Sequence, residues 1–337
     1  MKFPSLVLRP LAGGLAVFVL SMACGGSTPP PEAPDPSLEE SEGSEAGAVA
    51  PTSNASVRAG VDAIQRGDFE AAKRALEQAR SEAPNDPQAA FYHGVALQNL
   101  GDVDGARAAY ERALELDAKL VEASVNLSAL LLDTGASERA AEVAAQGLAA
   151  APGHADLLLN RALALENTGK RDEAIAAYGK AVDARPNDAE TRIAYADLLA
   201  ASGKRDLALE QLKQASETDD PKLLAAVAHW FGRLKAPAEC IAALDRAIER
   251  SATAELHTRR GVCRNEQGDS AGAKADYDRA LAMDESFAPA HYYLGMHLRA
   301  KDKKAALTHL KKASELGKDG PVGKAARDAV AELEKRK

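Results

Sequence analysis

The chain is 337 residues long, 46% hydrophobic and only 4% aromatic, with 50 acidic against 42 basic side chains. Hydrophobicity near the average of folded proteins excludes a wholly disordered chain, and a mean hydropathy of −0.29 excludes a polytopic membrane protein. The net charge of −8 argues against nucleic acid as a partner, because phosphate neutralisation needs a clustered basic surface.

The first 23 residues have the organisation of a secretory signal. Lys2 and Arg9 precede an apolar stretch from Leu11 to Leu20, which ends shortly before Cys24. That stretch is about half of the roughly 20 residues that a membrane-spanning helix needs, so it favours a signal peptide over a permanent anchor. We therefore predict that residues 1–23 are a signal peptide, that the protein is exported and that cleavage occurs before Cys24.

This segment resembles the signal of bacterial lipoproteins, in which a small residue precedes a cysteine that receives a diacylglycerol. Ala23 and Cys24 match that pattern, although Ser21 stands where the usual leucine would be and Leu20 lies one place earlier. The resemblance implies a lipid anchor on Cys24. Gly25 after the cysteine favours the outer membrane, with the protein facing the periplasm. The alternative is simple secretion, with Cys24 inside an ordinary signal peptide.

The segment that follows, residues 24–54, is dominated by Pro, Gly, Ser, Glu and Ala and contains no Lys or Arg. Such a composition cannot bury enough apolar surface to offset the entropy of ordering, so it predicts a disordered tether behind the lipidated cysteine. Its carboxylates repel one another and favour an extended spacer; they are Glu32, Asp35, Glu39, Glu40, Glu42 and Glu45. An acidic interaction tail is the alternative.

From residue 55 onward the sequence repeats itself about every 34 residues. A glycine marks a turn in most repeats, at Gly67, Gly101, Gly135, Gly169, Gly203 and Gly268. A small residue follows five positions later, at Ala72, Ala106, Ala140, Ala174, Ala208 and Ala273. Apolar residues on both sides of the turn recur at spacings of three and four, which indicates two helices per repeat. Two short helices cannot enclose a core alone, so the repeats are expected to stack.

These repeats resemble tetratricopeptide repeats. The small residue at the family's eighth position appears as Gly60, Gly94, Ser128, Ala162, Ala196, Ala228, Gly261 and Gly295. Units are predicted to begin near Ser53, Pro87, Val121, Ala155, Ala189, Pro221, Ala254 and Ala288. The resemblance implies an all-α, right-handed solenoid of about eight helical hairpins over residues 55–318, with a capping helix in residues 319–337. Units five and six are irregular, since the spacing shortens, Lys235-Ala236-Pro237 replaces the glycine turn and Cys240 replaces a small residue. Unit eight likewise has Lys301 in place of the turn glycine.

The sequence contains no arrangement of residues typical of an enzyme. The histidines His93, His154, His229, His257, His291, His297 and His309 lack the spacing of a zinc site, and there is no phosphate-binding glycine loop or nucleophile elbow. We therefore expect no catalysis, no metal and no cofactor.

Cys240 and Cys263 are expected on the second helix of unit six and the first helix of unit seven, which pack together in such stacks. An exported protein meets an oxidising compartment, so a disulfide between them is possible. The alternative is that both are buried small residues, because helix packing rarely gives the Cα separation that a disulfide requires.

In repeats of this family the first helices line a concave groove that binds peptides, and the resemblance assigns that role to inward positions here. The predicted groove residues are Phe91, Tyr92, Glu122, Asn126, Asp156, Asn160, Asn167, Asp197, Arg233, Arg259 and Arg299. The amides of Asn126 and Asn160 could both donate to and accept from an extended peptide backbone. The family's carboxylate clamp is missing, since Phe91 and Val95 stand at the matching places. The alternative is a solvated polar face.

Charge along these positions changes sign. Acidic side chains at Glu122, Asp133, Asp156, Glu190 and Asp197 give way to His229, Arg233, Arg259 and Arg299. This predicts an extended partner segment with basic and aliphatic side chains against units three to five and acidic ones towards units six to eight.

Together these features predict a non-catalytic scaffold or assembly factor of a bacterial cell envelope, with protein partners, a membrane contact through its lipid anchor and no nucleic-acid partner. One alternative is a protein associated with peptidoglycan or carbohydrate, for which the single Trp230 is the only tryptophan available as a sugar platform. Another is a regulatory subunit of an envelope enzyme.

Overall fold

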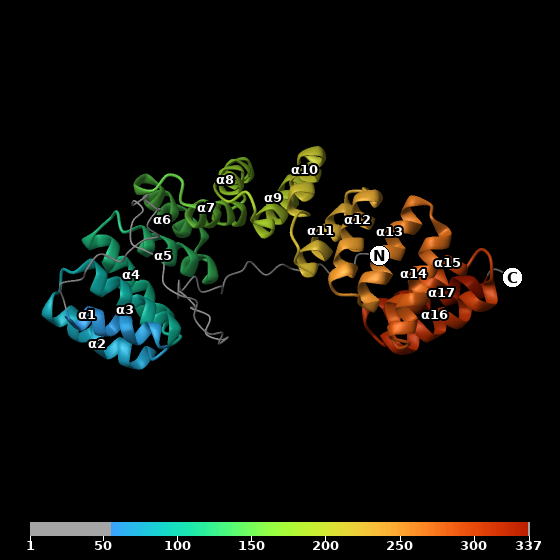
Figure 1. Cartoon of the computed structure of the whole chain (residues 1–337), viewed down its shortest axis with the longest axis horizontal. Coiled ribbons are helices and arrows are strands. Elements are labelled where there is room, and N and C mark those ends of the chain that lie inside the picture. The colour runs from blue at the N-terminus through green and yellow to red at the C-terminus, as the bar shows by residue number, and fades with distance from the viewer. Residues whose placement is uncertain (1–54, 336–337) are drawn as a thin grey trace, which may run out of the picture. The chain divides into compact units, whose positions relative to one another are not determined.

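The computed structural model describes residues 55–335, which form seventeen helices joined by short turns, with no strand among them (Figure 1). The all-α helical-hairpin class predicted from the repeat is therefore confirmed. The predicted signal peptide, Cys24 and the acidic tether lie outside the described residues. None of the described helices combines the length and the apolar character needed to cross a membrane.

The described helices belong to two compact units, one ending at Thr168 and one starting at Gly169. The N-terminal unit contains α1 (Ala55–Gln65), α2 (Phe69–Glu82), α3 (Pro87–Asn99), α4 (Val103–Leu116), α5 (Val121–Asp133), α6 (Ser137–Ala150) and α7 (Ala155–Asn167). The C-terminal unit contains α8 (Arg171–Ala184), α9 (Ala189–Ala201), α10 (Arg205–Ala215), α11 (Pro221–Arg233), α12 (Pro237–Arg250), α13 (Ala254–Gln267), α14 (Ser270–Met283), α15 (Ala288–Leu298), α16 (Lys303–Gly317) and α17 (Pro321–Lys335).

The helix starts follow the predicted repeat register. The residues predicted to begin units two to eight, from Pro87 to Ala288, are the first residues of α3, α5, α7, α9, α11, α13 and α15. Helix α1 begins at Ala55, two residues after the predicted start. The final helix, α17, lies in the segment expected to cap the stack.

The turns inside the hairpins use a left-handed backbone conformation. The φ angles are 74° at Gly67, 81° at Gly101 and 79° at Gly135, and they are similar at Gly169, Gly203 and Gly268. Glycine adopts this conformation without the Cβ clash that penalises other residues. Two turns lack the glycine: in unit six Lys235 takes the equivalent place with φ 56°, and in unit eight Lys301 does so without a left-handed φ.

Capping side chains define where many helices start. Asp102 Oδ1 accepts a hydrogen bond from Gly105 N at 2.9 Å, and Asp269 Oδ1 accepts one from Gly272 N at 2.8 Å. Such caps satisfy backbone donors that have no partner inside the helix. Pro221 and Pro237 open α11 and α12, where a missing N–H costs nothing.

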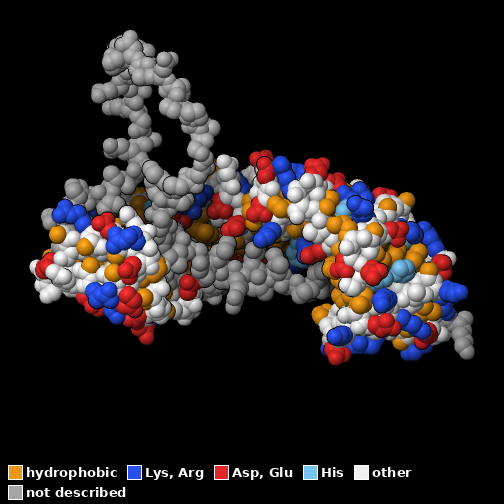
Figure 2. Space-filling view, turned by 60° about the horizontal axis from the view of Figure 1, so that its bottom comes forward, with side chains coloured by type: hydrophobic (Ala, Val, Ile, Leu, Met, Phe, Trp, Pro, Cys, Tyr) orange, Lys and Arg blue, Asp and Glu red, His pale blue; other side chains and the backbone are white. Residues whose placement is uncertain are grey.

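The core is made of small residues at the crossings and larger residues between them. Ala106, Ala140 and Ala174 are all fully buried, as the repeat pattern predicted. A Cβ added to Gly94 would lie 2.7 Å from the ring of Tyr110, so this position must stay small for the ring to pack. Outside the core, Figure 2 shows acidic and basic side chains interspersed over the visible surface, with apolar side chains scattered between them.

Candidate functional site

A cavity of about 450 Å³ opens in the C-terminal unit between α11, α12, α13 and α15. Its lining residues come mainly from three successive first helices, which is the face that the repeat family uses for partners. They are Ala228, His229, Gly232, Arg233, Lys235, Cys240, Leu244, Arg259, Val262, Cys263, Glu266, Tyr292, Tyr293 and Met296. Two of the predicted groove residues, Arg233 and Arg259, are among them.

Part of the cavity wall is apolar and covalently fixed. Cys240 of α12 and Cys263 of α13 are joined by a disulfide with an S–S distance of 2.05 Å and a Cα separation of 6.2 Å. Leu244 and Val262 flank this crosslink, and a Cβ added to Gly232 would come no closer than 4.0 Å to the Cys263 sulfur. The cavity therefore exists partly because the last turn of α11 carries glycine.

The charged residues of the lining are mostly cationic. The guanidinium of Arg233 lies 4.4 Å above the centre of the Trp230 ring, which holds it by a cation–π contact. Arg259 Nη2 lies 2.6 Å from Glu255 Oε1, and Lys235 Nζ lies 3.3 Å from Glu266 Oε1. The lining residues include three permanent cations and one carboxylate, and Glu255 pairs with one of these cations from outside the lining, so two carboxylates face three cations.

The remaining polar groups of the lining stay neutral near physiological pH. Burial, and then the charges of Arg259 and Arg233, lower the pKa of His229 below its usual value. Burial raises the pKa of Tyr293 to about 12, and it also raises the pKa of Tyr292. The histidine and the two tyrosines can thus donate or accept hydrogen bonds without adding charge.

The other predicted residues of the C-terminal unit do not line the cavity. Asp197 lies on α9, where burial raises the pKa of its carboxyl while the nearby charge of Arg233 lowers it. Arg299 follows α15 and is exposed. Of the predicted groove residues in this unit, Arg233 and Arg259 line the cavity and the other two do not.

In the N-terminal unit, the predicted asparagines connect neighbouring repeats. Asn160 Nδ2 donates to Ser128 Oγ at 2.9 Å and to Val125 O at 3.2 Å, which engages both amide hydrogens. Asn126 Nδ2 donates to the Tyr110 hydroxyl at 3.3 Å. Since these donors bind the preceding repeat, their first role is to hold the stack together.

Asn167 and the predicted aromatic and acidic residues of this unit differ in exposure. Asn167 Nδ2 donates to Ser137 Oγ at 3.3 Å. Phe91 is only 8% exposed, so it belongs to the core. Tyr92 and Asp156 are half-buried and Glu122 is exposed. Burial, and then the charge of Glu122, raise the pKa of Tyr92.

Several cavity residues were not anticipated from the sequence. Tyr292, Tyr293 and Met296 come from unit eight, and Lys235 comes from the irregular turn of unit six. The adjacent tyrosines and the missing turn glycine were visible signals. The depth of the cavity, in contrast, depends on how α12 packs behind α11 and α13, which the repeat pattern does not encode.

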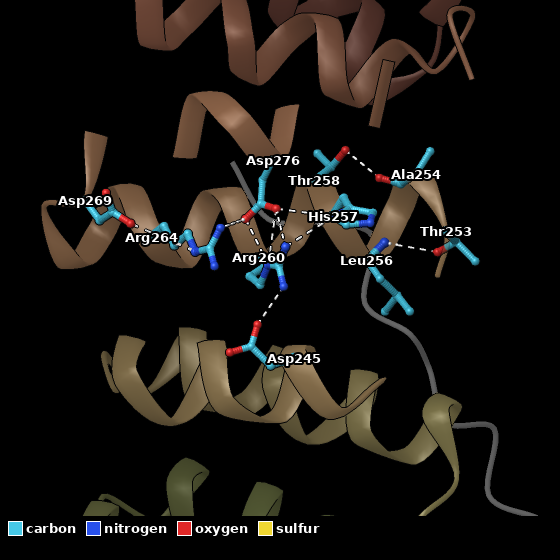
Figure 3. Close-up of polar contacts among 10 residues, drawn as sticks. All are labelled: Asp245, Thr253, Ala254, Leu256, His257, Thr258, Arg260, Arg264, Asp269 and Asp276. Carbon is cyan, nitrogen blue, oxygen red and sulfur yellow. Dashed lines mark hydrogen bonds and ion pairs between the residues drawn. The ribbon is translucent and has the colours of Figure 1, made fainter. Parts of the chain in front are cut away.

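A second cluster of polar residues joins α12, α13 and α14 (Figure 3). The carboxylate of Asp276, which is 2% exposed, accepts hydrogen bonds from Arg260 Nη2 at 2.6 Å and Arg264 Nη1 at 2.8 Å. His257 Nδ1 lies 3.3 Å from Asp276 Oδ1, and Arg260 Nη1 donates to Asp245 at 2.7 Å. Figure 3 shows Asp276 at the centre of these contacts. Because its partners converge on a buried carboxylate, the cluster is a structural link between units six and seven.

Within the described residues, no group of three or more His, Cys, Asp or Glu side chains is arranged to hold a metal ion.

The helical hairpins and the cavity on their first-helix face define a repeat protein of the interaction type. Models of the tetratricopeptide repeat match residues 57–120, 126–189 and 264–321, and a second such model matches residues 167–229. The chain belongs to the tetratricopeptide repeat family.

Solved structures of the same family are similar to this chain. A tetratricopeptide repeat protein from Parabacteroides merdae has a TM-score of 0.50 at 19% identity and covers 77% of this chain and 97% of its own. MamA from Desulfovibrio magneticus RS-1 has a TM-score of 0.46 at 25% identity, covering 49% of this chain and 96% of its own. YrrB, described as a TPR protein with an unusual peptide-binding site, has a TM-score of 0.45 at 22% identity, covering 55% and 96%. No curated protein matches the sequence.

Proposed function

We propose that this protein is a non-catalytic scaffold or assembly factor of a bacterial cell envelope, which binds an extended segment of another protein on its first-helix faces. The observation that carries this proposal is the cavity in the C-terminal unit, which is lined by α11, α13 and α15 and combines apolar walls with cationic groups. Concave sites with a few convergent polar groups are the usual places of ligand binding. An extended segment could cross three successive first helices and reach this cavity.

The acidic residues of the other inward positions support the same proposal. Asp133, Glu190 and Asp197 are exposed, so their carboxylates are accessible to a basic partner. We expect basic side chains of a partner near these residues and acidic side chains near Arg233 and Arg259.

The surroundings of Trp230 argue against the carbohydrate alternative. Its side chain is only 9% exposed, and Arg233 covers one face of its ring. Sugar platforms need an open aromatic face. Protein recognition therefore agrees better with the surroundings of Trp230.

Site-specific photo-crosslinking tests the scaffold proposal. We expect a photoreactive residue at Met296, in the cavity, to give a discrete protein adduct in envelope preparations of the source cell. The same residue at Arg279, an exposed position on α14, should give no such adduct. Equal labelling from both positions, or none from Met296, would contradict the proposal.

The envelope location is proposed from the sequence, and it is tested separately. Two or three acyl chains on Cys24 would give the stable membrane attachment that a single chain cannot. Replacing Cys24 with Ser should release the protein from the outer-membrane fraction. Unchanged membrane fractionation of this variant would remove the lipid anchor from the proposal.

A further inference from the structure

The cavity reaches deeper than the surface formed by the first helices. Its wall includes Cys240 and Leu244, which belong to α12, the second helix of unit six. The volume of about 450 Å³ lies within the range of roughly 300–1,000 Å³ found for pockets that enclose a ligand. A segment lying across the first helices could therefore insert a large side chain into this space.

The inner wall suits an apolar, aromatic group. Leu244, Val262 and Met296 present aliphatic and thioether surface, and the rings of Tyr292 and Tyr293 add aromatic surface. The two rings are perpendicular within 15°, at an interplanar angle of 75° and a centroid distance of 5.2 Å. Aromatic side chains bury large areas with few rotatable bonds, and methionine sulfur contacts their edges favourably.

The mouth of the cavity suits a carboxylate. Arg233 is fixed over Trp230, and Arg259 lies close enough to His229 and Tyr293 to influence the pKa of both. Guanidinium groups bind carboxylates through paired hydrogen bonds. Lys235 pairs with Glu266 and Arg259 pairs with Glu255, so Arg233, held over the Trp230 ring, is the cation at the mouth that is best placed to take a carboxylate from a partner.

Lys235 gives an independent indication that the mouth has a binding role. Seven hairpin turns of the described residues have a left-handed backbone. Six of them carry glycine at that place, and the seventh carries Lys235 with φ 56°. Its ion pair with Glu266 is largely solvated, with the lysine side chain 76% exposed, so that pair gives little stability in return. A side chain retained in an unfavourable conformation at the edge of a cavity points to function.

Building on the proposed function, we propose that the cavity binds an aromatic side chain of a partner segment while Arg233, flanked by Arg259 and Lys235, binds an acidic side chain next to it. The aromatic group anchors the segment, and the carboxylate fixes its direction along the first helices. The disulfide keeps α12 and α13 together behind the anchor, so the cavity is formed before the partner arrives.

The test uses short peptides that are acetylated and amidated, so that they carry no terminal charge. The probe has the core Asp-Phe-Asp with para-fluorophenylalanine, and its binding to the full chain is followed by fluorine NMR and calorimetry. We expect it to bind about tenfold or more tightly than peptides with the cores Asn-Phe-Asn, Lys-Phe-Lys or Asp-Ala-Asp. A peptide ending in Asn-Phe with a free carboxylate distinguishes a terminal acid from an acidic side chain, and it should bind more weakly than the probe.

Variants of the protein test whether the probe peptide binds in the cavity. Gly232→Leu fills the cavity and should weaken binding of the probe about tenfold or more, whereas Gly179→Leu adds the same side chain to helix α8, outside the cavity, as a control. Arg233→Gln should weaken binding about tenfold, and Arg171→Gln, at an exposed position on α8, should not. Lys235→Gly should weaken binding several-fold while the protein stays folded, which a purely structural lysine would not do.

Two results would overturn this ligand class. One is equal affinity for Asp-Phe-Asp and Asp-Ala-Asp, and the other is unchanged binding by Gly232→Leu. If the probe peptides fail to bind while the Met296 crosslink to a protein still forms, the aromatic and acidic ligand is wrong and the scaffold proposal remains. If both fail, the proposed function falls as well.

Discussion

The two units are built from the same repeat but are stabilised differently. Fully buried alanines occupy the helix crossings of both units, and in the N-terminal unit asparagine hydrogen bonds also connect one repeat to the next. In the C-terminal unit, a disulfide, a buried ion network and a cavity occur together around α11 to α15. Regular repeats satisfy their own packing with small residues, whereas a site that leaves space open needs additional links around it. We infer that units six to eight, among which unit six departs from the regular turn, are where a partner would bind.

The largest expected loss of stability comes from breaking the ion network of the C-terminal unit. Asp276→Ala leaves Arg260 and Arg264 without their buried carboxylate, which should cost about 3–5 kcal/mol in the free energy of unfolding. Urea unfolding followed by fluorescence of Trp230, the one tryptophan of the chain, measures this unit specifically. Asp278→Asn, which removes a half-exposed pair with Lys274 on the same helix, is the control and should cost less than about 1 kcal/mol. Similar losses for both variants would mean that the network is no stronger than a surface pair.

The next effect concerns the disulfide. Replacing Cys240 and Cys263 with alanine should lower the free energy of unfolding by about 3 kcal/mol, because the crosslink closes a separation of 23 residues and restricts the unfolded chain. The unfolding midpoint in urea measures this loss. A reductant should lower the midpoint of the wild type and leave the midpoint of the double variant unchanged. A wild type insensitive to reductant under denaturing conditions would show that the thiols are not joined.

The stability of the N-terminal unit is expected to depend on pH through His93. Burial, and then the charge of Arg80, lower the pKa of His93 from 6.5 to about 4. Between these values the unfolded chain binds the proton and the folded chain does not, so the associated stability is complete above pH 6.5 and is lost as the pH falls towards 4. The loss should be at most about 3 kcal/mol. Thermal melts from neutral to acidic pH should show a shallower decline for His93→Gln than for the wild type, and parallel curves would contradict this assignment.

The alanine packing of the N-terminal unit provides a further test. Ala140 is fully buried, so Ala140→Leu should overpack the crossing and cost about 1–3 kcal/mol. Ala145→Leu, at an exposed position of the same helix, should leave stability within about 0.5 kcal/mol of wild type. Far-UV circular dichroism during urea unfolding measures both. A wild-type midpoint for Ala140→Leu would mean that this helix crossing tolerates a larger side chain and that the small residue is not required there.

The smallest expected effect is a gain in stability, whereas the others are losses. Lys235→Gly should stabilise the C-terminal unit by about 0.5–1 kcal/mol, because the left-handed conformation penalises lysine more than the added freedom of glycine destabilises the fold. Gly203→Lys, the reverse change at an equivalent turn, should destabilise it by a similar amount. If Lys235→Gly is less stable than the wild type, the lysine is retained for stability, and its role at the cavity loses support.

The sequence predicted the repeat because the repeat has local causes. Left-handed turns require glycine at positions such as Gly101, and close crossings require alanine at positions such as Ala106, so both leave a periodic signal. Arg233 and Arg259 were found because their helices follow that period. Met296, Lys235 and the depth of the cavity were missed because they depend on departures from the period and on the packing of α12 behind two other helices. Asn160 was placed on the correct helix, but only the structure shows that Ser128 and Val125 occupy its amide hydrogens.

The disulfide between α12 and α13 also sets how this region responds to force. It closes a segment of 23 residues, so a pull on the two ends of the chain is transmitted through the crosslink and cannot extend the backbone inside it. Reduction would release an extra contour length of about 80 Å, at roughly 3.4 Å per residue. Under a pulling force, the disulfide-bonded chain would therefore lengthen less than the reduced chain before the helices that line the cavity separate.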